Sequence, residues 1–383
     1  MLRILADANI PHAQAAFGAY GPVRTQPGRD ITRSALADVD VLLVRSVTAV
    51  GAALLDGTPV RFVGTATAGT DHVDTRALAA RGVAFASAPG SNAASVADYV
   101  VAALLAVAAD RGEALTEKTI GIVGVGEVGG RLVPRARALG LRVLACDPPR
   151  AAAGRSDHEY RALADVLRQS DVVTLHTPLT RADESEWPTL GLIDLAAVET
   201  MKPGAWLVNA ARGRVVTAEA AAALAASRPV VLDVWPAEPE PDPALVDAAA
   251  LATPHIAGYA ADAKTRGTTM IAAALAAWAG GDAWAPPEPA PLVLDAPERP
   301  AQTPEERTRW LDALARQATD VRADDARFRA ALAGTAGEAR AAAFAALRKT
   351  YPVRHEMTRY AVRGDVPPAL RAAVTEGLGM ALA

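Results

Sequence analysis

Residues 120–129 read Ile120-Gly-Ile-Val-Gly124-Val-Gly126-Glu-Val-Gly129. An apolar strand here runs into a G-x-G-x-x-G turn, the pattern that places a pyrophosphate at the N-terminus of the following helix. Gly124 permits the tight turn, Gly126 lets the backbone approach the pyrophosphate, and Gly129 allows the helix to pack closely on the strand. The stretch therefore predicts a dinucleotide-binding domain.

A second apolar strand supplies the context that a bare glycine triplet lacks. Residues 141–146 lead into Asp147, which follows Gly129 by 18 positions. An acid at this spacing binds the adenosine ribose hydroxyls and disfavours a 2′-phosphate. The pattern therefore predicts NAD rather than NADP as the cofactor.

Composition narrows the class of protein. A length of 383 residues predicts two or three domains, and 51% hydrophobic residues exclude wholesale disorder. The net charge of −4 offers no basic face to nucleic acid or to an anionic membrane. Cys146 is the only cysteine, which fits a reducing compartment, and Asp98 interrupts the most apolar run. We therefore expect a cytoplasmic protein without nucleic-acid or membrane partners.

Short apolar runs alternate with helical patterns along most of the chain. In the first hundred residues we expect strands at 3–6, 39–45, 60–64 and 83–86. Six further strands are expected at 119–123, 142–146, 171–176, 205–209, 229–234 and 250–253. With their intervening helices they predict a doubly wound parallel sheet, the Rossmann form of an α/β fold.

The remaining patterns predict three domains. A helix at about 262–280 is expected to return to the first α/β unit, so that unit would comprise 1–95 and 258–285, with 96–257 inserted. The proline-rich run from 286 to 291, with Pro297 and Pro300 beyond it, predicts an extended linker into a third module, 286–383. Within that module we expect helices at 304–319, 325–332 and 337–347 and a strand at 358–362.

An arginine follows the fourth strand of the predicted Rossmann sheet. Arg212 lies just past residues 205–209, at the carboxyl edge where open α/β sheets bind ligands. Its planar guanidinium matches a carboxylate in bidentate fashion and would orient a hydroxy acid. The alternative is a surface arginine or one that contacts a phosphate.

An acid and a histidine follow the last two strands. Removing hydride from an alcohol requires a base for the hydroxyl proton, and imidazole suits that role. His255 follows the final strand, and Glu238, 17 residues earlier, is placed to hold the other ring nitrogen. Taken alone, such a histidine is more often packed in a loop. Arg, Glu and His at successive strand ends predict a catalytic group.

Together these motifs resemble the D-isomer-specific 2-hydroxyacid dehydrogenases. Within this family, the sequence more closely resembles the branch that acts on 4-phospho-D-erythronate and carries a C-terminal dimerisation domain. It rests on residues 44–48, 62–74, 121–126, 146–150, 176–179, 253–259, 320–325 and 351–354. The resemblance implies a flavodoxin-like substrate domain, an inserted Rossmann NAD domain, an α+β C-terminal dimerisation domain and a homodimer.

The resemblance also implies roles for individual residues. Arg212, Glu238 and His255 would be catalytic. Ser46, Thr67 and Tyr259 would contact the substrate. NAD would be bound by Gly124, Gly126, Glu127, Val128, Gly129, Asp147, Thr177, Asp233 and Gly258. For Ser46 and Thr67 the alternative is a strand-end cap, and for Asp233 it is a loop anchor. No metal ligand is implied.

The implied reaction is the NAD-dependent oxidation of 4-phospho-D-erythronate to (R)-3-hydroxy-2-oxo-4-phosphooxybutanoate in vitamin B6 biosynthesis. The phosphate requires a cation, for which Arg45 is the nearest candidate, and Arg354 is a second if it reaches across a dimer interface. One rival is another D-2-hydroxyacid dehydrogenase, of the phosphoglycerate or glyoxylate type. A rival of another class is a non-catalytic NAD-sensing corepressor.

Overall fold

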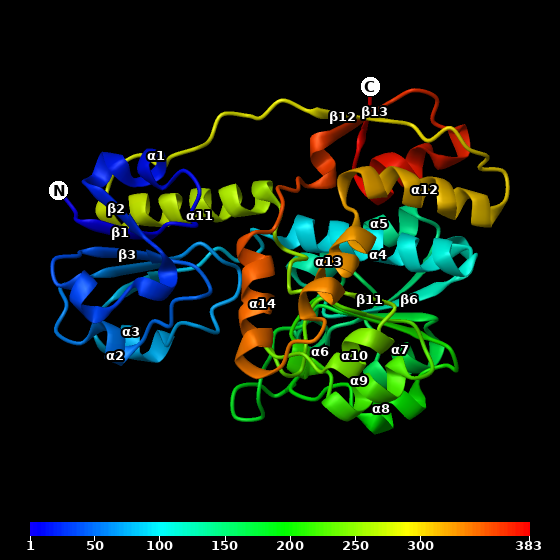
Figure 1. Cartoon of the computed structure of the whole chain (residues 1–383), viewed down its shortest axis with the longest axis horizontal. Coiled ribbons are helices and arrows are strands. Elements are labelled where there is room, and N and C mark those ends of the chain that lie inside the picture. Colours follow the sequence, from blue (N-terminus) through cyan, green and yellow to red (C-terminus); the bar gives the residue numbers. More distant parts are fainter. The chain divides into compact units, whose positions relative to one another are not determined.

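The computed structural model describes residues 1–383, and the chain divides into two compact units. The first unit comprises Met1–Ala94 and Tyr259–Ala290, and the second comprises Ser95–Gly258 and Pro291–Ala383. Both units are therefore built from two separate stretches of sequence, which the colours of Figure 1 trace. The C-terminal residues share a unit with the predicted Rossmann domain. The three-domain division stays a prediction.

The first unit contains a five-stranded parallel sheet in the order β2-β1-β3-β4-β5. Its strands are β1 (Ile4–Asp7), β2 (Val23–Gln26), β3 (Val41–Val44), β4 (Phe62–Thr65) and β5 (Ala84–Ala86). This is the flavodoxin-like order, in which the ligand side lies beyond the carboxyl ends of β1 and β3. Strand β2 was missing from the prediction because its Val-Arg-Thr-Gln sequence is half exposed and lacks an apolar run.

Helices pack on both faces of this sheet. They are α1 (Ala13–Phe17), α2 (Ala52–Leu55), α3 (Thr75–Ala80) and α11 (Ala261–Ala279). The expected return of the later helix is confirmed, because Ile271, Ala272 and Leu275 of α11 join the core that β1, β3 and β4 form. Contact is close: a Cβ on Gly267 would lie 2.8 Å from the carbonyl oxygen of Ala66.

The second unit contains a six-stranded parallel sheet in the order β11-β10-β9-β8-β6-β7. Its strands are β6 (Thr119–Val123), β7 (Arg142–Cys146), β8 (Val172–Leu175), β9 (Trp206–Asn209), β10 (Val230–Leu232) and β11 (Leu251–Ala252). The bounds of β6 and β7 match the prediction, and the other four strands are shorter by a residue or more at their ends. The strand order reverses between β6 and β8, which is where such sheets bind nucleotides.

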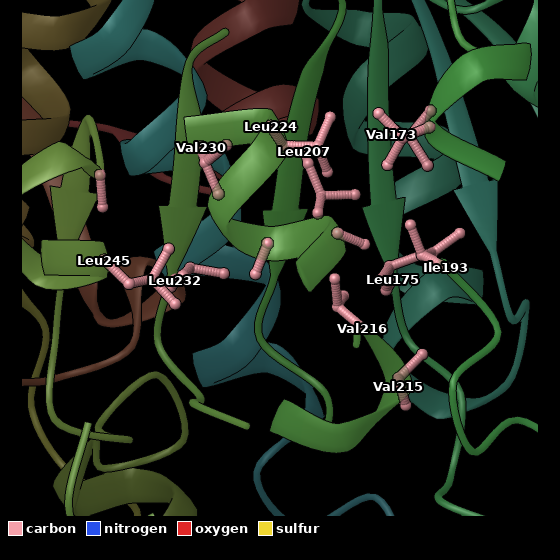
Figure 2. Close-up of a cluster of buried hydrophobic side chains, with 14 of the residues drawn as sticks. Val173, Leu175, Ile193, Leu207, Val215, Val216, Leu224, Val230, Leu232 and Leu245 are labelled. Carbon is pink, nitrogen blue, oxygen red and sulfur yellow. The ribbon is translucent and has the colours of Figure 1, made fainter. Parts of the chain in front are cut away.

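The helices around this sheet bury a continuous apolar core. They are α4 (Ala93–Arg111), α5 (Glu127–Ala138), α6 (Pro148–Ala152), α7 (Leu163–Gln169), α8 (Leu195–Thr200), α9 (Ala218–Ala225) and α10 (Pro243–Ala248). Figure 2 shows Leu207 of β9 beside Leu224 of α9, with Leu175 of β8 and Leu232 of β10 in the same buried cluster. Burying each leucine contributes roughly 1.5–3 kcal/mol to folding.

Helix α4 is long and apolar enough to cross a membrane by length and composition alone. In the structure 83% of its most apolar window is buried inside the protein. Val101, Leu104 and Leu105 are fully or almost fully buried. These observations identify α4 as a core helix of its unit.

The C-terminal stretch adds helices and a small parallel sheet. It contains α12 (Pro304–Ala318), α13 (Val321–Leu332) and α14 (Gly337–Lys349), and strands β12 (Leu292–Asp295), β13 (Tyr360–Arg363) and β14 (Ala381–Leu382). The sheet order is β12-β13-β14. The extended linker was therefore predicted too long: β12 follows Pro291 directly, and Val293 pairs with Ala361 of β13.

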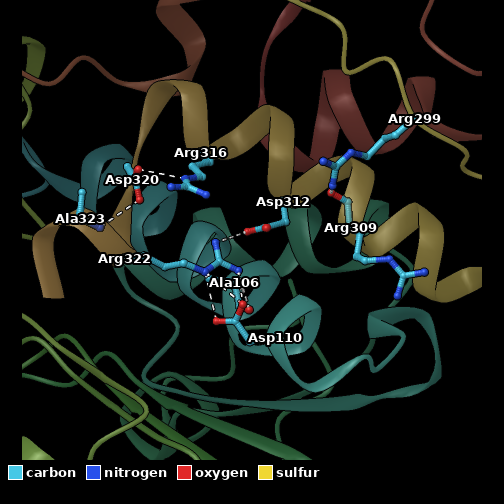
Figure 3. A network of polar contacts seen from close by, with 9 residues as sticks. All are labelled: Ala106, Asp110, Arg299, Arg309, Asp312, Arg316, Asp320, Arg322 and Ala323. Carbon is cyan, nitrogen blue, oxygen red and sulfur yellow. Dashed lines mark hydrogen bonds and ion pairs between the residues drawn. The ribbon is translucent and has the colours of Figure 1, made fainter. Parts of the chain in front are cut away.

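Charged side chains tie this stretch to the Rossmann sheet. Arg322 of α13 donates to Asp110 and to the Ala106 carbonyl of α4, and to Asp312 of α12 (Figure 3). Asp325 accepts a hydrogen bond from the backbone N–H of Ala252 in β11 at 2.7 Å. Helix α13 thereby covers an edge strand that would otherwise expose unpaired backbone groups.

Candidate active site

The glycine turn has the geometry that its sequence predicts. Gly124 has φ +87°, and a Cβ there would lie 2.7 Å from the His176 carbonyl oxygen. A Cβ on Gly129 would lie 2.0 Å from the carbonyl oxygen of Gly124. Around Gly126, by contrast, a Cβ would meet nothing within 4 Å. Two glycines therefore shape the turn, and the third borders open space at the N-terminus of α5.

The groups around this turn fit a dinucleotide. Asp147 accepts hydrogen bonds from the N–H groups of Val125 at 2.8 Å and Arg150 at 3.1 Å, so it ties the end of β7 to the turn. Thr177, just past β8, has a buried hydroxyl without a hydrogen-bond partner in the protein. An unsatisfied buried hydroxyl beside an open turn suits a polar ligand. Glu127 and Val128 form the first turn of α5, next to the same opening.

Cys146, at the end of β7, is buried. Burial, together with the charge of Asp147, raises the pKa of its thiol to about 11. The thiol is therefore not an activated nucleophile.

Arg212 is positioned by the turn after β9. The side chain of Asn209 donates to the Arg212 carbonyl at 3.0 Å and accepts from the N–H of Ala211 at 3.1 Å. The Arg212 side chain donates to the Ala211 carbonyl at 2.9 Å and is partly exposed. A Cβ on the next residue, Gly213, would lie 1.8 Å from the Trp235 carbonyl oxygen. The arginine turn therefore lies directly against the loop that carries Glu238.

His255 and Glu238 form a hydrogen-bonded pair. His255 Nδ1 lies 2.9 Å from Glu238 Oε2, while Oε1 accepts the Trp235 N–H at 2.8 Å. Burial alone would raise the pKa of Glu238, but the His255 ring and the Trp235 N–H outweigh it and lower the pKa below its ordinary value. The glutamate is therefore an ionised acceptor at neutral pH. Since a carboxylate can only accept, Nδ1 carries a proton, and in the neutral form of the ring Nε2 is the nitrogen with the free lone pair.

The loop that carries His255 is held by Asp233. Both oxygens of this buried carboxylate accept backbone N–H groups, from Ile256 at 2.7 Å and Ala257 at 2.9 Å. The Thr253 hydroxyl donates to the same carboxylate at 2.8 Å. His255 itself has φ +58°, a left-handed conformation that costs about 1–3 kcal/mol outside glycine. Asp233 therefore anchors the loop, and its proposed contact with NAD stays a prediction.

The expected substrate residues lie in the first unit, where each is described by itself. Ser46 is exposed, two residues past the end of β3. Thr67 follows β4, where its hydroxyl lies 2.7 Å from that of Thr65 and donates to the Gly69 carbonyl at 2.9 Å. Tyr259 has the Lys264 ammonium 5.0 Å from its ring centre. Ser46 and Thr67 thus lie beyond the carboxyl ends of β3 and β4.

Arg354 is not where the cross-interface hypothesis requires it. Its side chain is 6% exposed and donates to the carbonyls of Ile256 and Ala257 in its own chain. Burial against its own loop leaves no guanidinium to extend toward a partner subunit. Arg354 therefore contacts the His255 loop of its own chain, and Ser95 and Gly213, which also shape this region, were not identified from sequence.

Residues 95–257 match the family model for the D-isomer specific 2-hydroxyacid dehydrogenase, NAD binding domain, and residues 297–378 match a domain of unknown function (DUF3410). A protein named erythronate-4-phosphate dehydrogenase from Salinibacter ruber is 53% identical over 100% of this chain and 99% of its own length. The chain belongs to the erythronate-4-phosphate dehydrogenase family. A member from Pseudomonas aeruginosa, strain UCBPP-PA14, is 48% identical over 95% of this chain and 96% of its own.

Solved structures agree on the fold. D-lactate dehydrogenase from Aquifex aeolicus, complexed with NAD and lactic acid, matches with a TM-score of 0.62 at 21% identity, over 72% of this chain and 95% of that one. A glyoxylate reductase from Paecilomyes thermophila matches with a TM-score of 0.61 at 24% identity, over 74% and 97%. The chain is an NAD-dependent oxidoreductase with a Rossmann NAD-binding domain, as its sequence predicted.

Proposed function

We propose that this protein oxidises the C2 hydroxyl of 4-phospho-D-erythronate to the 2-oxo acid, (R)-3-hydroxy-2-oxo-4-phosphooxybutanoate, in pyridoxal 5′-phosphate biosynthesis. The main support for the proposal is the His255–Glu238 pair, in which Nδ1 lies 2.9 Å from Oε2. Arg212 follows β9, which is the neighbour of β10, the strand that precedes Glu238. Family members with this name, about half identical over nearly the whole chain, support the choice of substrate.

The roles follow from the chemistry of each group. The glycine turn from Gly124 to Gly129 would hold NAD⁺, which would supply the acceptor for the hydride from C2. The guanidinium of Arg212 pairs with the substrate carboxylate and thereby orients C2. His255 Nε2 takes the hydroxyl proton as the C–O bond becomes a carbonyl. Glu238 holds Nδ1–H, fixes the tautomer and stabilises the imidazolium that forms.

Substrate recognition is assigned to the first unit. We propose that Ser46, Thr67 and Tyr259 contact the hydroxy acid and that Arg45 binds its phosphate. The Thr65–Thr67–Gly69 hydrogen bonds support Thr67, because they fix its hydroxyl beyond the end of β4. Changing Arg45 to Ala is expected to abolish the preference for phosphorylated over dephosphorylated erythronate. A preference that survives the change would exclude Arg45.

A substrate panel tests the proposal. The full-length protein would be assayed for NADH absorbance with 4-phospho-D-erythronate, erythronate, 3-phosphoglycerate and glycolate. We expect kcat/KM for 4-phospho-D-erythronate to exceed the others by at least about 100-fold, the scale set by pairing a charged group correctly. Higher values for phosphoglycerate or glycolate would replace the proposed substrate. NADH binding without turnover of any acid would favour a corepressor.

We also propose a cytoplasmic homodimer that associates through the C-terminal stretch. Val293, Val353 and Leu382 in that stretch are large apolar side chains left exposed, and Val353 is 81% exposed. A contiguous exposed apolar patch marks an interaction surface, and we propose that these side chains contribute to one. Changing Val353 to Asp is expected to shift the sedimentation of the full chain toward a monomer. Changing Leu195 to Asp, on α8, is the matched control and is expected to leave the dimer intact.

A further inference from the structure

The backbone of Ile256 and Ala257, directly after His255, is held by hydrogen bonds to two charged side chains. Asp233 accepts the N–H groups of Ile256 and Ala257, as described above. On the other side, Arg354 Nη2 donates to the Ile256 carbonyl at 3.2 Å and to the Ala257 carbonyl at 2.6 Å. The same two residues therefore have both their donors and their acceptors fixed by buried charged side chains.

Ser95 forms hydrogen bonds with both Ala257 and Arg354. Its hydroxyl donates to the Ala257 carbonyl at 2.7 Å and accepts from Arg354 Nη2 at 2.9 Å. Ser95 is fully buried near the start of α4, and it is the first residue of its unit. Ala257 lies one residue before the chain leaves that unit. Arg354 thus joins three segments that are far apart in the sequence.

Arg354 is itself held on both sides along the chain. Tyr351, whose ring centre lies 5.9 Å from the Arg354 guanidinium carbon, donates its hydroxyl to Asp324 of α13 at 2.8 Å. On the other side, the N–H of Met357 donates to Asp98 of α4 at 2.8 Å. The segment from 351 to 357 is therefore fixed to α13 and α4 by hydrogen bonds at both of its ends, and Arg354 extends its guanidinium from a rigid support.

A rigid support matters because of the conformation of His255. A left-handed histidine persists only where its surroundings determine the backbone. If the carbonyls of Ile256 and Ala257 were released, the loop would relax and Nδ1 would move away from Glu238. A displacement of about 1 Å in a catalytic group lowers turnover by up to about 100-fold.

We propose that Arg354, in the C-terminal stretch, is a positioning residue that holds the His255 loop in its reactive conformation. This inference rests on the proposed function, since it assigns His255 as the base. It gives the C-terminal stretch a part in turnover within a single chain, separate from any part in dimer formation. Arg354 acts only through the loop and does not itself touch the reacting atoms.

Arg329 is a matched control for this role. It belongs to the same stretch and donates to two carbonyls of the same unit, those of Val246 and Ala249, which precede β11 and lie away from His255. Replacing either arginine by Met removes two backbone contacts and one side-chain contact, with Ser95 for Arg354 and with Asp325 for Arg329, and keeps most of the side-chain length. A purely structural role predicts similar effects on stability and activity at both positions.

The test compares Arg354→Met, Arg354→Lys and Arg329→Met in the full-length protein. For Arg354→Met we expect kcat with 4-phospho-D-erythronate to fall by about 10-fold to 100-fold, with Kd for NADH within about twofold. The Lys variant is expected to recover at least about a third of the wild-type kcat, because an ammonium still reaches one carbonyl. For Arg329→Met we expect kcat within about twofold, whatever its Tm. Equal losses of kcat in both Met variants, or none in Arg354→Met, would overturn the proposal.

If Arg354→Met does not fold, Ser95→Ala removes the hydroxyl between Arg354 and Ala257, and its kcat is expected to fall several-fold; an unchanged kcat would overturn the proposal. If the wild type does not oxidise 4-phospho-D-erythronate, the proposed function fails first. NMR of ¹³C-histidine then tests the positioning alone. The His255 signal, identified by its loss in His255→Gln, should shift in Arg354→Lys and not in Arg329→Met; an unmoved signal would contradict the inference.

Discussion

The Cα of Gly213 lies so close to Trp235 that a Cβ there would be 1.8 Å from the Trp235 carbonyl oxygen. This contact joins the turn after β9, which carries Arg212, to the loop after β10, which carries Glu238. The spacing of Arg212 and Glu238, the two residues proposed to be catalytic, therefore depends on a position where only glycine fits. The contact also shows why a glycine directly follows the arginine.

Changing Gly213 to Ala should damage both stability and turnover. The backbone of Trp235 must move to admit a methyl group, so we expect the free energy of unfolding to fall by about 2–3 kcal/mol. Urea unfolding measures the loss. Gly130→Ala in α5 is the control, because its Cβ would have its nearest contact at 3.6 Å, an ordinary distance. Equal stability of the two variants would show that the contact is not tight.

Arg212 should not tolerate lysine. An ammonium keeps the charge but loses the planar fork that matches a carboxylate, so we expect kcat/KM to fall by about 100-fold in Arg212→Lys. Arg214→Lys changes an exposed arginine two residues away and should leave kcat/KM within about twofold. Steady-state kinetics of both variants give the comparison. Similar values for the two would remove Arg212 from the site.

Different glycines of the turn are expected to affect NADH binding and folding stability. In Gly126→Ala the new methyl group enters open space, so we expect an unchanged Tm and a Kd for NADH raised by at least about tenfold. In Gly129→Ala the methyl group meets the Gly124 carbonyl at 2.0 Å, so we expect the free energy of unfolding to fall by about 2–3 kcal/mol. Fluorescence titration and urea unfolding measure the two effects. Normal NADH binding by the Gly126→Ala variant would contradict the assignment of the pyrophosphate site.

His176 should make stability depend on pH. Burial lowers the pKa of this side chain from 6.5 to about 3. Between these values the unfolded chain binds a proton that the folded protein does not, so stability is complete above pH 6.5 and is lost as the pH falls toward 3. The loss attributable to one such proton is about 1.4 kcal/mol per pH unit. Between pH 6.5 and pH 4, urea unfolding should show that the free energy of unfolding of wild type falls by about 1.4 kcal/mol per pH unit more than that of His176→Gln. Parallel curves would rule out a neutral buried imidazole.

Sequence predicted the parts of the fold that local patterns encode. The glycine turn, the bounds of β6 and β7 and the strand-end positions of Arg212, Glu238 and His255 all follow from short-range spacing. Strand β2 was not predicted because its sequence is polar and half exposed. Strand β12 was not predicted because the prolines on both sides of it suggested a linker.

The hydrogen bonds that hold the His255 loop could not be predicted, for a different reason. Arg354 and Ala257 are 97 positions apart, and Ser95 and Ala257 are 162 apart. No periodicity reports a hydrogen bond across such separations. The pairing of Asp233 with the His255 loop was open for the same reason: a strand-end acid looks alike in sequence whether it binds a ligand or anchors a loop.

The most direct test of the account is the turnover of His255→Gln in the full-length protein. The amide keeps the polarity of the side chain but cannot take the hydroxyl proton. With 4-phospho-D-erythronate and NAD⁺ we predict a kcat lower by about 10³-fold and a Kd for NADH within about twofold of wild type. A kcat within about tenfold of wild type would contradict the assignment of His255 as the base.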